Sequence, residues 1–324
     1  MVGTAEGRMR ALVVEELGEP ARLRERNEPQ AADDRLVLDV VAAPLNPADV
    51  SIARGAFFAG HPPLPYVVGI EAVARSAGGK LFYTCLDGLG LSRDGAIAER
   101  CVASRDALVP VPATVDPALA AALGTAGLAA WIPLTRRTQV RPDDVVLILA
   151  ATGTVGLVAV QTAKLLGAAR VVAVGRSAPR LATARAYGAD AVVELAGQED
   201  LAGAYLRACD GVRPTLIFDP LWGQPAVAAL EAAAHFARVI QLGQGAAAEA
   251  SVPSGLIRGK GLDILGYTNV ILPFEELAAS YAELVGHAAA GRIHLEVERV
   301  PLDDAADAWR RQLDGVGSKL VICP

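Results

Sequence analysis

Hydrophobic and polar positions change their pattern twice along this 324-residue chain. From Met9 to Val111, short apolar segments alternate with Gly and Pro, which predicts a domain built from β-strands. The expected strands are Ala11–Val14, Arg35–Val41, Gly69–Arg75, Lys80–Cys85 and Ala96–Val102. Residues 46–69 are rich in Pro, Gly and aromatic side chains, and a long loop of this kind inside a β domain is a place to look for a ligand site.

From Asp144 to Tyr267 the pattern becomes short apolar runs separated by helix-sized segments. A parallel sheet covered by helices on both faces requires such runs, because its strands are buried on both sides. We therefore expect a doubly wound nucleotide-binding domain. Its strands are predicted at Val145–Leu149, Arg170–Val174, Ala191–Val193, Leu216–Phe218, Val239–Leu242 and Leu262–Leu265.

The segments that flank this domain predict how the chain enters and leaves it. The Ala-rich segment Asp116–Leu134 starts with an Asp-Pro pair typical of a helix start, and is expected to carry the chain into the second domain. After Pro273 the expected elements are a helix at Glu275–Ala290, a strand at Glu296–Val300, a helix at Asp303–Leu313 and a strand at Lys319–Ile322. This tail is unlike the repeating unit, so we expect it to return to the first domain. The predicted division is 1–118 and 268–324 for the first domain and 119–267 for the second.

Composition and charge narrow the function classes. Hydrophobic residues make up 52% of the chain and charged residues 20%, which argues against disorder. The net charge is −6 and no basic block is present, so nucleic acid is not an expected partner. The four cysteines form no CxxC pair, which favours a reducing cytoplasm over a disulfide framework. Neither Met1–Arg10 nor the apolar stretch Val145–Val160 has the pattern of a signal peptide or membrane span, so no membrane partner is expected.

The segment Val145–Gly156 has the order strand, glycine turn, helix that a dinucleotide site needs. Gly153 would let the backbone approach a pyrophosphate, and Gly156 would let helix and strand pack closely. The following helix N-terminus would supply amides and a positive dipole end. The first glycine of the usual fingerprint is replaced by Ala151, and an ordinary turn that binds nothing is the alternative. The strand and helix around the turn favour a dinucleotide.

The residues that follow the second predicted strand indicate which dinucleotide. An Asp or Glu at this point would bind the ribose 2′-hydroxyl of NADH. This chain has Gly175, Arg176 and Ser177 there, with Arg180 shortly after. Cations and a hydroxyl without a carboxylate fit a 2′-phosphate, which favours NADPH as the cofactor. The alternative is that both arginines are solvated charges at a helix start.

Several further segments carry a family resemblance: Met9–Val14, Pro44–Asp49, Pro65–Glu71, the turn at 150–156 with Gln161 and Lys164, and Gly317–Ile322. With these segments the chain resembles the zinc-independent quinone oxidoreductases of the medium-chain dehydrogenase/reductase superfamily, over nearly its whole length from Met9. The quinone reductase signature usually has Ser or Ala where Thr152 stands and Gly where Thr154 stands. The resemblance implies an α/β fold in which a GroES-like, β-rich catalytic domain is split between the chain ends. A Rossmann domain is inserted between its parts, with the active-site cleft at their junction.

The resemblance also implies roles for individual residues. Asn46 would lie beside the nicotinamide, Arg180 at the 2′-phosphate, and Leu242–Gln244 on the nicotinamide side of the cleft. Two tyrosines of the family are replaced here, by Ser51 and by Glu194-Leu195, so no proton donor is evident. The residues expected at the cofactor are Asn46, Gly153, Thr154, Val155, Gly156, Gly175, Arg176, Ser177, Arg180, Leu242, Gly243 and Gln244.

No metal site is expected. Zinc alcohol dehydrogenases of the same superfamily have Cys at the position of Asn46 and His at the position of Ile70. Isoleucine offers a metal no ligand, and a neutral amide is a poor zinc ligand beside thiolate or imidazole. Glu71, in an apolar strand, is expected to be a structural hydrogen-bonding carboxylate. The histidines are isolated in sequence and are expected on the surface or in helix packing: His61, His235, His287 and His294.

The residues therefore favour one reaction over its rivals. Alcohol oxidation without a metal lacks a Lewis acid, whereas a C=C bond conjugated to a carbonyl needs hydride, donors for the enolate oxygen and a proton. We expect a zinc-free, NADPH-dependent oxidoreductase that reduces a quinone or the C=C bond of an enone, with Asn46 and Tyr66 as catalytic candidates. Ser51 and Tyr267 are further candidate donors, and for each candidate a structural role is an equal alternative.

Two other functions remain open at this point, an enoyl-thioester reductase and a non-catalytic NADPH-binding protein. The expected partners are a small conjugated carbonyl substrate and a second copy of the chain. The resemblance implies a homodimer in which the last Rossmann strand, here Leu262–Leu265, pairs across a two-fold axis.

Overall fold

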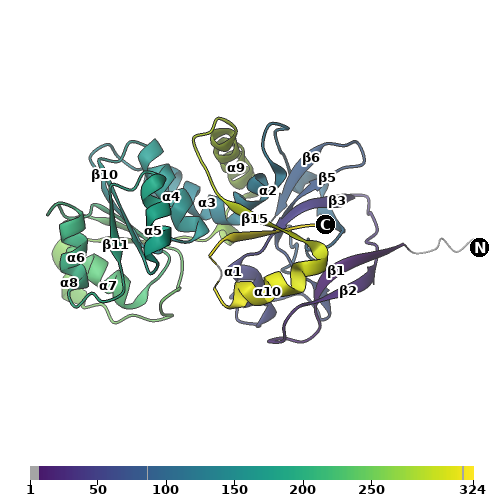
Figure 1. Ribbon diagram of the computed structural model, residues 1–324, viewed down its shortest axis with the longest axis horizontal. Helices are drawn as coiled ribbons and strands as arrows, with labels where there is room; N and C mark the ends of the chain where they lie inside the picture. The colour runs from purple at the N-terminus through teal and green to yellow at the C-terminus, as the bar shows by residue number, and fades with distance from the viewer. Residues whose placement is uncertain (1–6, 86, 316) are drawn as a thin grey trace, which may run out of the picture. The chain divides into compact units, whose positions relative to one another are not determined.

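The computed structural model describes residues 7–85, 87–315 and 317–324, and it divides the chain into two compact units (Figure 1). Residues up to Ala126 form the first unit together with Pro273–Ala290 and Glu296–Pro324. The second unit contains Gly127–Leu272 and Gly291–Leu295. The chain thus crosses between units a few residues beyond the boundaries expected at 118 and 267. Residues 1–6 of the segment searched for a signal peptide lie outside the described residues.

The second unit has a six-stranded parallel sheet in the order β11-β10-β9-β12-β13-β14. Its strands are β9 Val145–Ile148, β10 Arg170–Gly175, β11 Ala191–Glu194, β12 Leu216–Asp219, β13 Arg238–Gln241 and β14 Asp263–Gly266. Each overlaps a strand expected from the apolar runs, so the predicted doubly wound sheet is confirmed. The strand order reverses between β9 and β12, and ligands of such sheets bind at this switch point, outside the carboxyl ends of the strands.

Helices join these parallel strands, as parallel connections require. They are α4 Thr154–Leu165, α5 Ala178–Ala186, α6 Leu201–Ala208, α7 Gly223–Ala232 and α8 Ser254–Lys260. One hydrophobic core is shared by alternate residues of β9, such as Val145 and Leu147, and by buried residues of α6 and α7, such as Tyr205 and Leu230. The continuous apolar runs therefore reflect burial on both faces of the sheet.

The first unit contains two β-sheets. One has the order β2-β1-β4, and the other has the order β15-β16-β3-β5-β6-β8 with β7 also paired to β3. The strands are β1 Arg8–Val14, β2 Arg22–Asn27, β3 Arg35–Pro44, β4 Tyr66–Val67, β5 Glu71–Arg75, β6 Leu81–Cys85, β7 Arg100–Ser104, β8 Leu108–Pro110, β15 Val297–Pro301 and β16 Lys319–Cys323. The C-terminal strand β16 pairs with β3, which places the end of the chain beside the segment that leads to Asn46.

Two features of the first unit were not predicted. Strand β2 was missed because its sequence, Arg-Leu-Arg-Glu-Arg-Asn, is almost entirely polar; it pairs only with β1 among the described strands, as an edge strand. The helix start predicted at Asp116-Pro117 is confirmed, because Asp116 caps the first helix and Pro117 begins it. The break within the Asp116–Leu134 segment was not predicted. The chain forms α2 Pro117–Ala122 and α3 Thr125–Ile132, which continues into a π-helical turn. A Cβ at Gly124 would lie 2.1 Å from Glu71 Oε2, so the chain bends where a buried carboxylate comes close.

The remaining helices of the first unit are α1 Pro47–Ala53, α9 Phe274–Ala289 and α10 Ala305–Leu313. Trp309 of α10 is fully buried in the main core, together with Leu12 of β1 and Ile52 of α1. This packing fixes α1, which begins immediately after Asn46. Within the described part of the chain, no helix combines the length and the apolar character needed to cross a membrane.

Candidate functional site

The glycine turn of the second unit has the geometry that a phosphate site needs. Gly153 is the N-cap of α4, and the first-turn amides of any helix have no acceptor within the helix. A Cβ at Gly156 would lie 2.4 Å from Ala150 O and 2.5 Å from Ala151 Cα, so only glycine lets α4 pack this close to the turn. The residues expected at the pyrophosphate are thus placed together at the carboxyl end of β9.

The end of β10 lies against this turn. A Cβ at Gly175 would be 2.3 Å from the Thr152 methyl group, so the two segments touch. Arg176 is exposed, Ser177 is the N-cap of α5, and Arg180 is half-buried, which lowers its pKa. Neither guanidinium makes a hydrogen bond or ion pair with a residue that the structure describes. Two cations without a counter-charge stand where the sequence predicts a ribose 2′-phosphate.

The loop after β13 contains the third group of expected cofactor residues. Leu242, Gly243 and Gln244 lie at the same sheet edge as the glycine turn, because both follow the carboxyl ends of parallel strands. A Cβ at Gly243 would be 2.6 Å from Pro220 O, and Gly245 N–H donates to that oxygen at 3.1 Å. The loops after β12 and β13 therefore pack directly on each other.

Asp219, which was not singled out from the sequence, binds the backbone of the loop that follows β12. It is fully buried at the end of β12, and its Oδ1 accepts from the N–H groups of Leu221 and Trp222, both at 2.9 Å. Its Oδ2 has no partner among the described residues. Burial raises the pKa of Asp219, and the two backbone bonds oppose that rise. An acid directly after an apolar strand at the switch point was the available signal.

In the first unit, the side chain of Asn46 is bonded at both ends of its carboxamide and is only 2% exposed. Its Nδ2 donates to Glu71 Oε1 at 2.7 Å and to Pro44 O at 3.3 Å. Its Oδ1 accepts from Lys319 Nζ at 2.6 Å, and the same ammonium donates to Leu45 O at 2.8 Å. Both hydrogens of the amide group are therefore engaged within the protein.

Glu71 is the centre of this buried network. Besides the bond from Asn46, its Oε2 accepts from Tyr83 Oη at 2.7 Å and from Thr125 N–H at 2.6 Å. The Tyr83 ring stacks on Tyr281 with centroids 4.0 Å apart. Glu71 has the hydrogen-bonding role that the sequence suggested for it. Tyr83 and Lys319 were not singled out from the sequence, although a lysine in the otherwise apolar Lys319–Cys323 strand was a usable signal.

Asp49 and Tyr66 form the other polar part of the site. The Asp49 carboxylate accepts from Asn46 N–H at 2.8 Å and from Ile70 N–H at 3.0 Å. Burial raises the pKa of Asp49 to about 7, the Asn46 bond opposes the rise, and nearby Glu71 adds to it. The phenol of Tyr66 is 1% exposed and its Oη has no partner among the described residues. Burial, followed by the charge of Asp49, raises the pKa of Tyr66.

Two further candidate donors differ in their surroundings. Ser51 is half-buried on α1. Tyr267, in the second unit, already donates its hydroxyl hydrogen to Asn269 Oδ1 at 2.7 Å. Of the four candidate donors, only Tyr66 combines deep burial with an unbonded hydroxyl among the described residues.

The positions of the zinc ligands in zinc alcohol dehydrogenases do not fit a zinc ion here. Ile70 has an aliphatic side chain, and Asn46 Oδ1 faces the ammonium of Lys319 instead of open space. A metal cation at this oxygen would be repelled by the cation already bonded to it. Among the described residues, no group of three or more His, Cys, Asp or Glu side chains is placed to bind a metal ion.

Gln161 and Lys164, which belong to the family-like segment, lie on the far part of α4. Gln161 pairs with the backbone of His294, donating to its O at 2.8 Å and accepting from its N at 2.7 Å. Lys164 binds Asp190 at 3.1 Å. These residues border a cavity of about 410 Å³ at the C-terminal end of α4, away from the glycine turn at its N-terminal end. Gln161 therefore anchors the segment 291–295 to α4 of the second unit.

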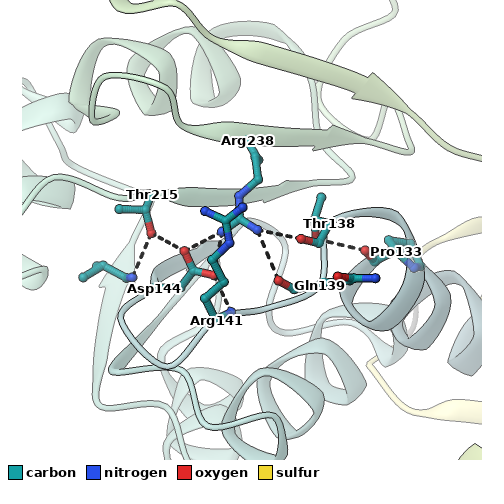
Figure 2. A network of polar contacts seen from close by, with 8 residues as sticks. Pro133, Thr138, Gln139, Arg141, Asp144, Thr215 and Arg238 are labelled. Atoms are coloured by element: carbon teal, nitrogen blue, oxygen red, sulfur yellow. Dashed lines mark hydrogen bonds and ion pairs between the residues drawn. The ribbon is translucent and has the colours of Figure 1, made fainter.

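A second buried network lies at the amino ends of the parallel strands, opposite the carboxyl ends that the glycine turn follows. Figure 2 shows the residues of this network. Arg238 binds both oxygens of Asp144 at 2.5 and 2.6 Å and donates to Thr138 O at 2.6 Å. Thr215 Oγ1 donates to Asp144 Oδ1 at 2.7 Å. Burial alone would raise the pKa of Asp144, but the bonds from Arg238, Arg141 N–H and Thr215 outweigh it and lower that pKa. The network joins the amino ends of β9, β12 and β13.

Comparison with known proteins finds similarity to a dehydrogenase family and to quinone oxidoreductases. The family described as zinc-binding dehydrogenase matches residues 154–284. The quinone oxidoreductase from Thermus thermophilus, solved also as a complex with NADPH, is 30% identical with a TM-score of 0.80, over 98% of this chain and 100% of that chain. Quinone oxidoreductase-like protein 2 of Rattus norvegicus is 28% identical over 79% of this chain and 74% of its own length.

A different kind of relative is much longer than this chain. A phenolphthiocerol/phthiocerol polyketide synthase component of Mycobacterium tuberculosis is 29% identical over 96% of this chain. The chain spans 15% of the length of that synthase polypeptide. Its similarity is to one segment of a much larger protein.

Proposed function

Because this chain belongs to the quinone oxidoreductase-like family of the medium-chain dehydrogenase/reductase superfamily, we propose that it reduces a quinone or the C=C bond of an enone with NADPH. The family makes the protein an oxidoreductase with a GroES-like unit and a Rossmann unit. The observation that carries the finer proposal is the engagement of Asn46 Oδ1 by Lys319, at a position where zinc enzymes bind their metal.

The second unit would hold the cofactor through groups already in place. The amides at Gly153–Gly156 would bind the pyrophosphate, and Arg176 with Arg180 would bind the 2′-phosphate. The loop Leu242–Gln244 would border the nicotinamide. Bound NADPH supplies the hydride. The 30% identical Thermus thermophilus enzyme, which binds NADPH, supports this cofactor.

The first unit supports a conjugated acceptor over a simple ketone. A saturated ketone would develop a full alkoxide charge and would need strong donors or a Lewis acid. A quinone or enone spreads the incoming charge over a conjugated system. The amide hydrogens of Asn46 are engaged, so we assign the donor role to Tyr66, whose hydroxyl has no partner among the described residues.

An enoyl-thioester reductase is the second candidate. The observation that favours it is the 29% identity to a segment of a polyketide synthase, because polyketide chains are carried as thioesters. The chemistry is the same, since a thioester carbonyl also activates an adjacent C=C bond. The two candidates differ in the group attached to the carbonyl carbon.

Two properties of the protein as a whole belong to the same proposal. We propose a homodimer, supported by β14, whose described pairing is with β13 alone and which leaves a strand edge open. We also propose a reducing cytoplasm as its location, supported by four cysteines that are all unpaired. Light scattering that finds only monomer at micromolar concentration would contradict the dimer.

The test is a comparison of NADPH oxidation with quinones, small enones, unsaturated thioesters and matched saturated ketones. We expect the best conjugated acceptor to exceed its saturated counterpart by about 100- to 1000-fold in kcat/KM, the range of one lost oxyanion donor. The variant Tyr66→Phe should lower kcat on that acceptor and leave NADPH affinity unchanged. Efficient oxidation of a saturated alcohol with NADP⁺ would refute the proposal. NADPH binding without turnover of any acceptor would favour the non-catalytic alternative.

A further inference from the structure

Lys319 is a buried lysine on the C-terminal strand β16 with no assigned role. It is 6% exposed, and its ammonium donates to Asn46 Oδ1 at 2.6 Å and to Leu45 O at 2.8 Å. We infer that Lys319 is a positioning residue of the active site that acts through Asn46. The inference rests on the proposed function, in which Asn46 stands at the position where zinc enzymes of the superfamily bind their metal.

The two ends of the Asn46 carboxamide have partners that require opposite hydrogen-bonding roles. Lys319 can only donate and Glu71 Oε1 here accepts, so the amide oxygen must face the lysine and the amide nitrogen must face the glutamate. If the carboxamide turned over, two donors would meet at one end and two acceptors at the other. The two partners therefore select one orientation of Asn46.

This orientation decides what Asn46 can offer a bound molecule. Both hydrogens of Nδ2 are engaged, by Glu71 Oε1 and by Pro44 O. Its Oδ1 accepts from Lys319 Nζ. Held in this way, Asn46 has no free hydrogen with which to donate to an enolate oxygen.

The groups that face Lys319 come from several segments of the first unit. Asn46 and Leu45 follow β3, Asp49 lies on α1, and Glu71 begins β5. Burial lowers the pKa of Lys319, and the charges of Glu71 and Asp49 oppose that effect. The lysine thus joins the last strand of the chain to the segment that presents Asn46.

A purely stabilising role does not explain such a residue well. A buried charge loses its hydration, and well-packed apolar replacements of buried ionic groups are often neutral or stabilising. Lys319 also binds no carboxylate of the described residues directly, as a stabilising ion pair would; it binds a neutral amide that a carboxylate holds from the other side. The arrangement fixes the direction of the amide.

Lys319→Met tests the inference, with Lys260→Met as the matched control. Lys260 donates to three backbone carbonyls at the end of α7, at 2.5 to 3.0 Å, and lies in the second unit. The measurements are hydrogen exchange of the Asn46 Nδ2 protons by ¹⁵N NMR, NADPH affinity, and kcat and KM on the best acceptor. We expect Lys319→Met to speed the exchange and to lower kcat by roughly 10- to 100-fold, the scale of a misplaced active-site group.

The remaining results separate positioning from stability. NADPH affinity should stay within about twofold, and Lys319→Arg, which keeps a donor, should recover part of kcat. Lys260→Met should leave the Asn46 exchange rate and kcat unchanged. An unchanged Asn46 exchange rate, or a kcat within about twofold of the wild type, in Lys319→Met would overturn the inference.

A second variant and a measurement that does not depend on turnover keep the inference testable. If Lys319→Met does not fold, Tyr83→Phe removes one donor from Glu71 and loosens the same network from its other end. It should also speed Asn46 exchange, and unchanged exchange would count against the inference. If none of the acceptors tested supports NADPH oxidation by the wild-type protein, the proposed function fails. The NMR measurement still decides whether Lys319 orients Asn46.

Discussion

Among the residues that the structure describes, each unit buries one cation in a polar network, and the two cations are bound in different ways. In the Rossmann unit, Arg238 forms a direct ion pair with Asp144 and donates to both of its carboxylate oxygens (Figure 2). In the GroES-like unit, Lys319 meets a neutral amide, and Glu71 holds that amide from the other side. Arg238 lies at the amino end of β13, whereas the glycine turn follows the carboxyl end of β9. Lys319, in contrast, binds a candidate active-site residue.

The difference separates two uses of a buried charge. A direct bidentate pair satisfies both ions and ties the strands that carry them, so its effect should be on stability. An indirect pair leaves a third group oriented between the ions, so its effect should be on what that group does. Three predictions test this contrast beyond the Lys319 variants.

The largest expected effect is on the Rossmann unit. Asp144→Ala would leave the guanidinium of Arg238 buried and unpaired, which should lower the free energy of unfolding by about 3–5 kcal/mol. Hydrogen exchange of the β9 and β13 amides, followed by mass spectrometry, measures the loss in that unit. The control is Glu298→Ala, which removes an exposed pair with Arg311 and should leave the exchange unchanged. A stable variant with altered NADPH affinity would contradict the purely structural role of this pair.

A second expected effect is a different pH dependence in each unit. The folded pKa of Asp49 is about 7, above its ordinary value of 3.8, so the folded state keeps a proton that the unfolded chain has lost between those values. Stability of the GroES-like unit should therefore fall by about 2–4 kcal/mol as pH rises from 4 to 7. The pKa of Asp144 is lowered, so its contribution is present above about pH 4 and is lost as pH falls through its folded pKa.

Unit-resolved hydrogen exchange between pH 5 and 8, corrected for the intrinsic exchange rate, tests this contrast. Amides of β3 and β5 should lose protection as pH rises, and those of β9 and β13 should not. Asp49→Asn removes the titrating group and should flatten the response of the first unit. If the exchange protection of the β3 and β5 amides in the wild-type protein does not depend on pH, Asp49 does not hold its proton in this range.

The smallest expected effect concerns a cation that is neither buried nor paired. Arg176 makes no bond to a described residue and is exposed beside the nucleotide turn. Arg176→Ala should weaken NADPH binding by about 1–3 kcal/mol and leave NADH binding almost unchanged, because only NADPH carries the 2′-phosphate. Calorimetric titration with both cofactors measures the difference. The matched control is Arg185→Ala, at the far end of α5, which should affect neither cofactor. Equal losses for NADPH and NADH would assign Arg176 to general stability.

Parts of the candidate site were readable from the sequence because their chemistry is local. The glycine turn between β9 and α4, the basic residues after β10 and the glycine after β13 each follow a strand directly, and parallel strands bring their carboxyl ends to one sheet edge. The network around Asn46 was not readable in this way. Lys319 and Asn46 are 273 positions apart, and their contact exists only because β16 pairs with β3.

The sequence by itself determined the elements whose burial is uniform: the apolar strands of the Rossmann sheet and the turn that follows β9. It did not reveal β2, whose charged side chains follow no apolar alternation, or the break between α2 and α3, which depends on a carboxylate 54 positions away. The hydrophobic periodicity of a segment shows which of its faces is buried in the core and which is exposed to solvent. The direction of a buried polar group depends on which distant donors and acceptors surround it, and only the tertiary structure decided that for Asn46, Asp49 and Glu71.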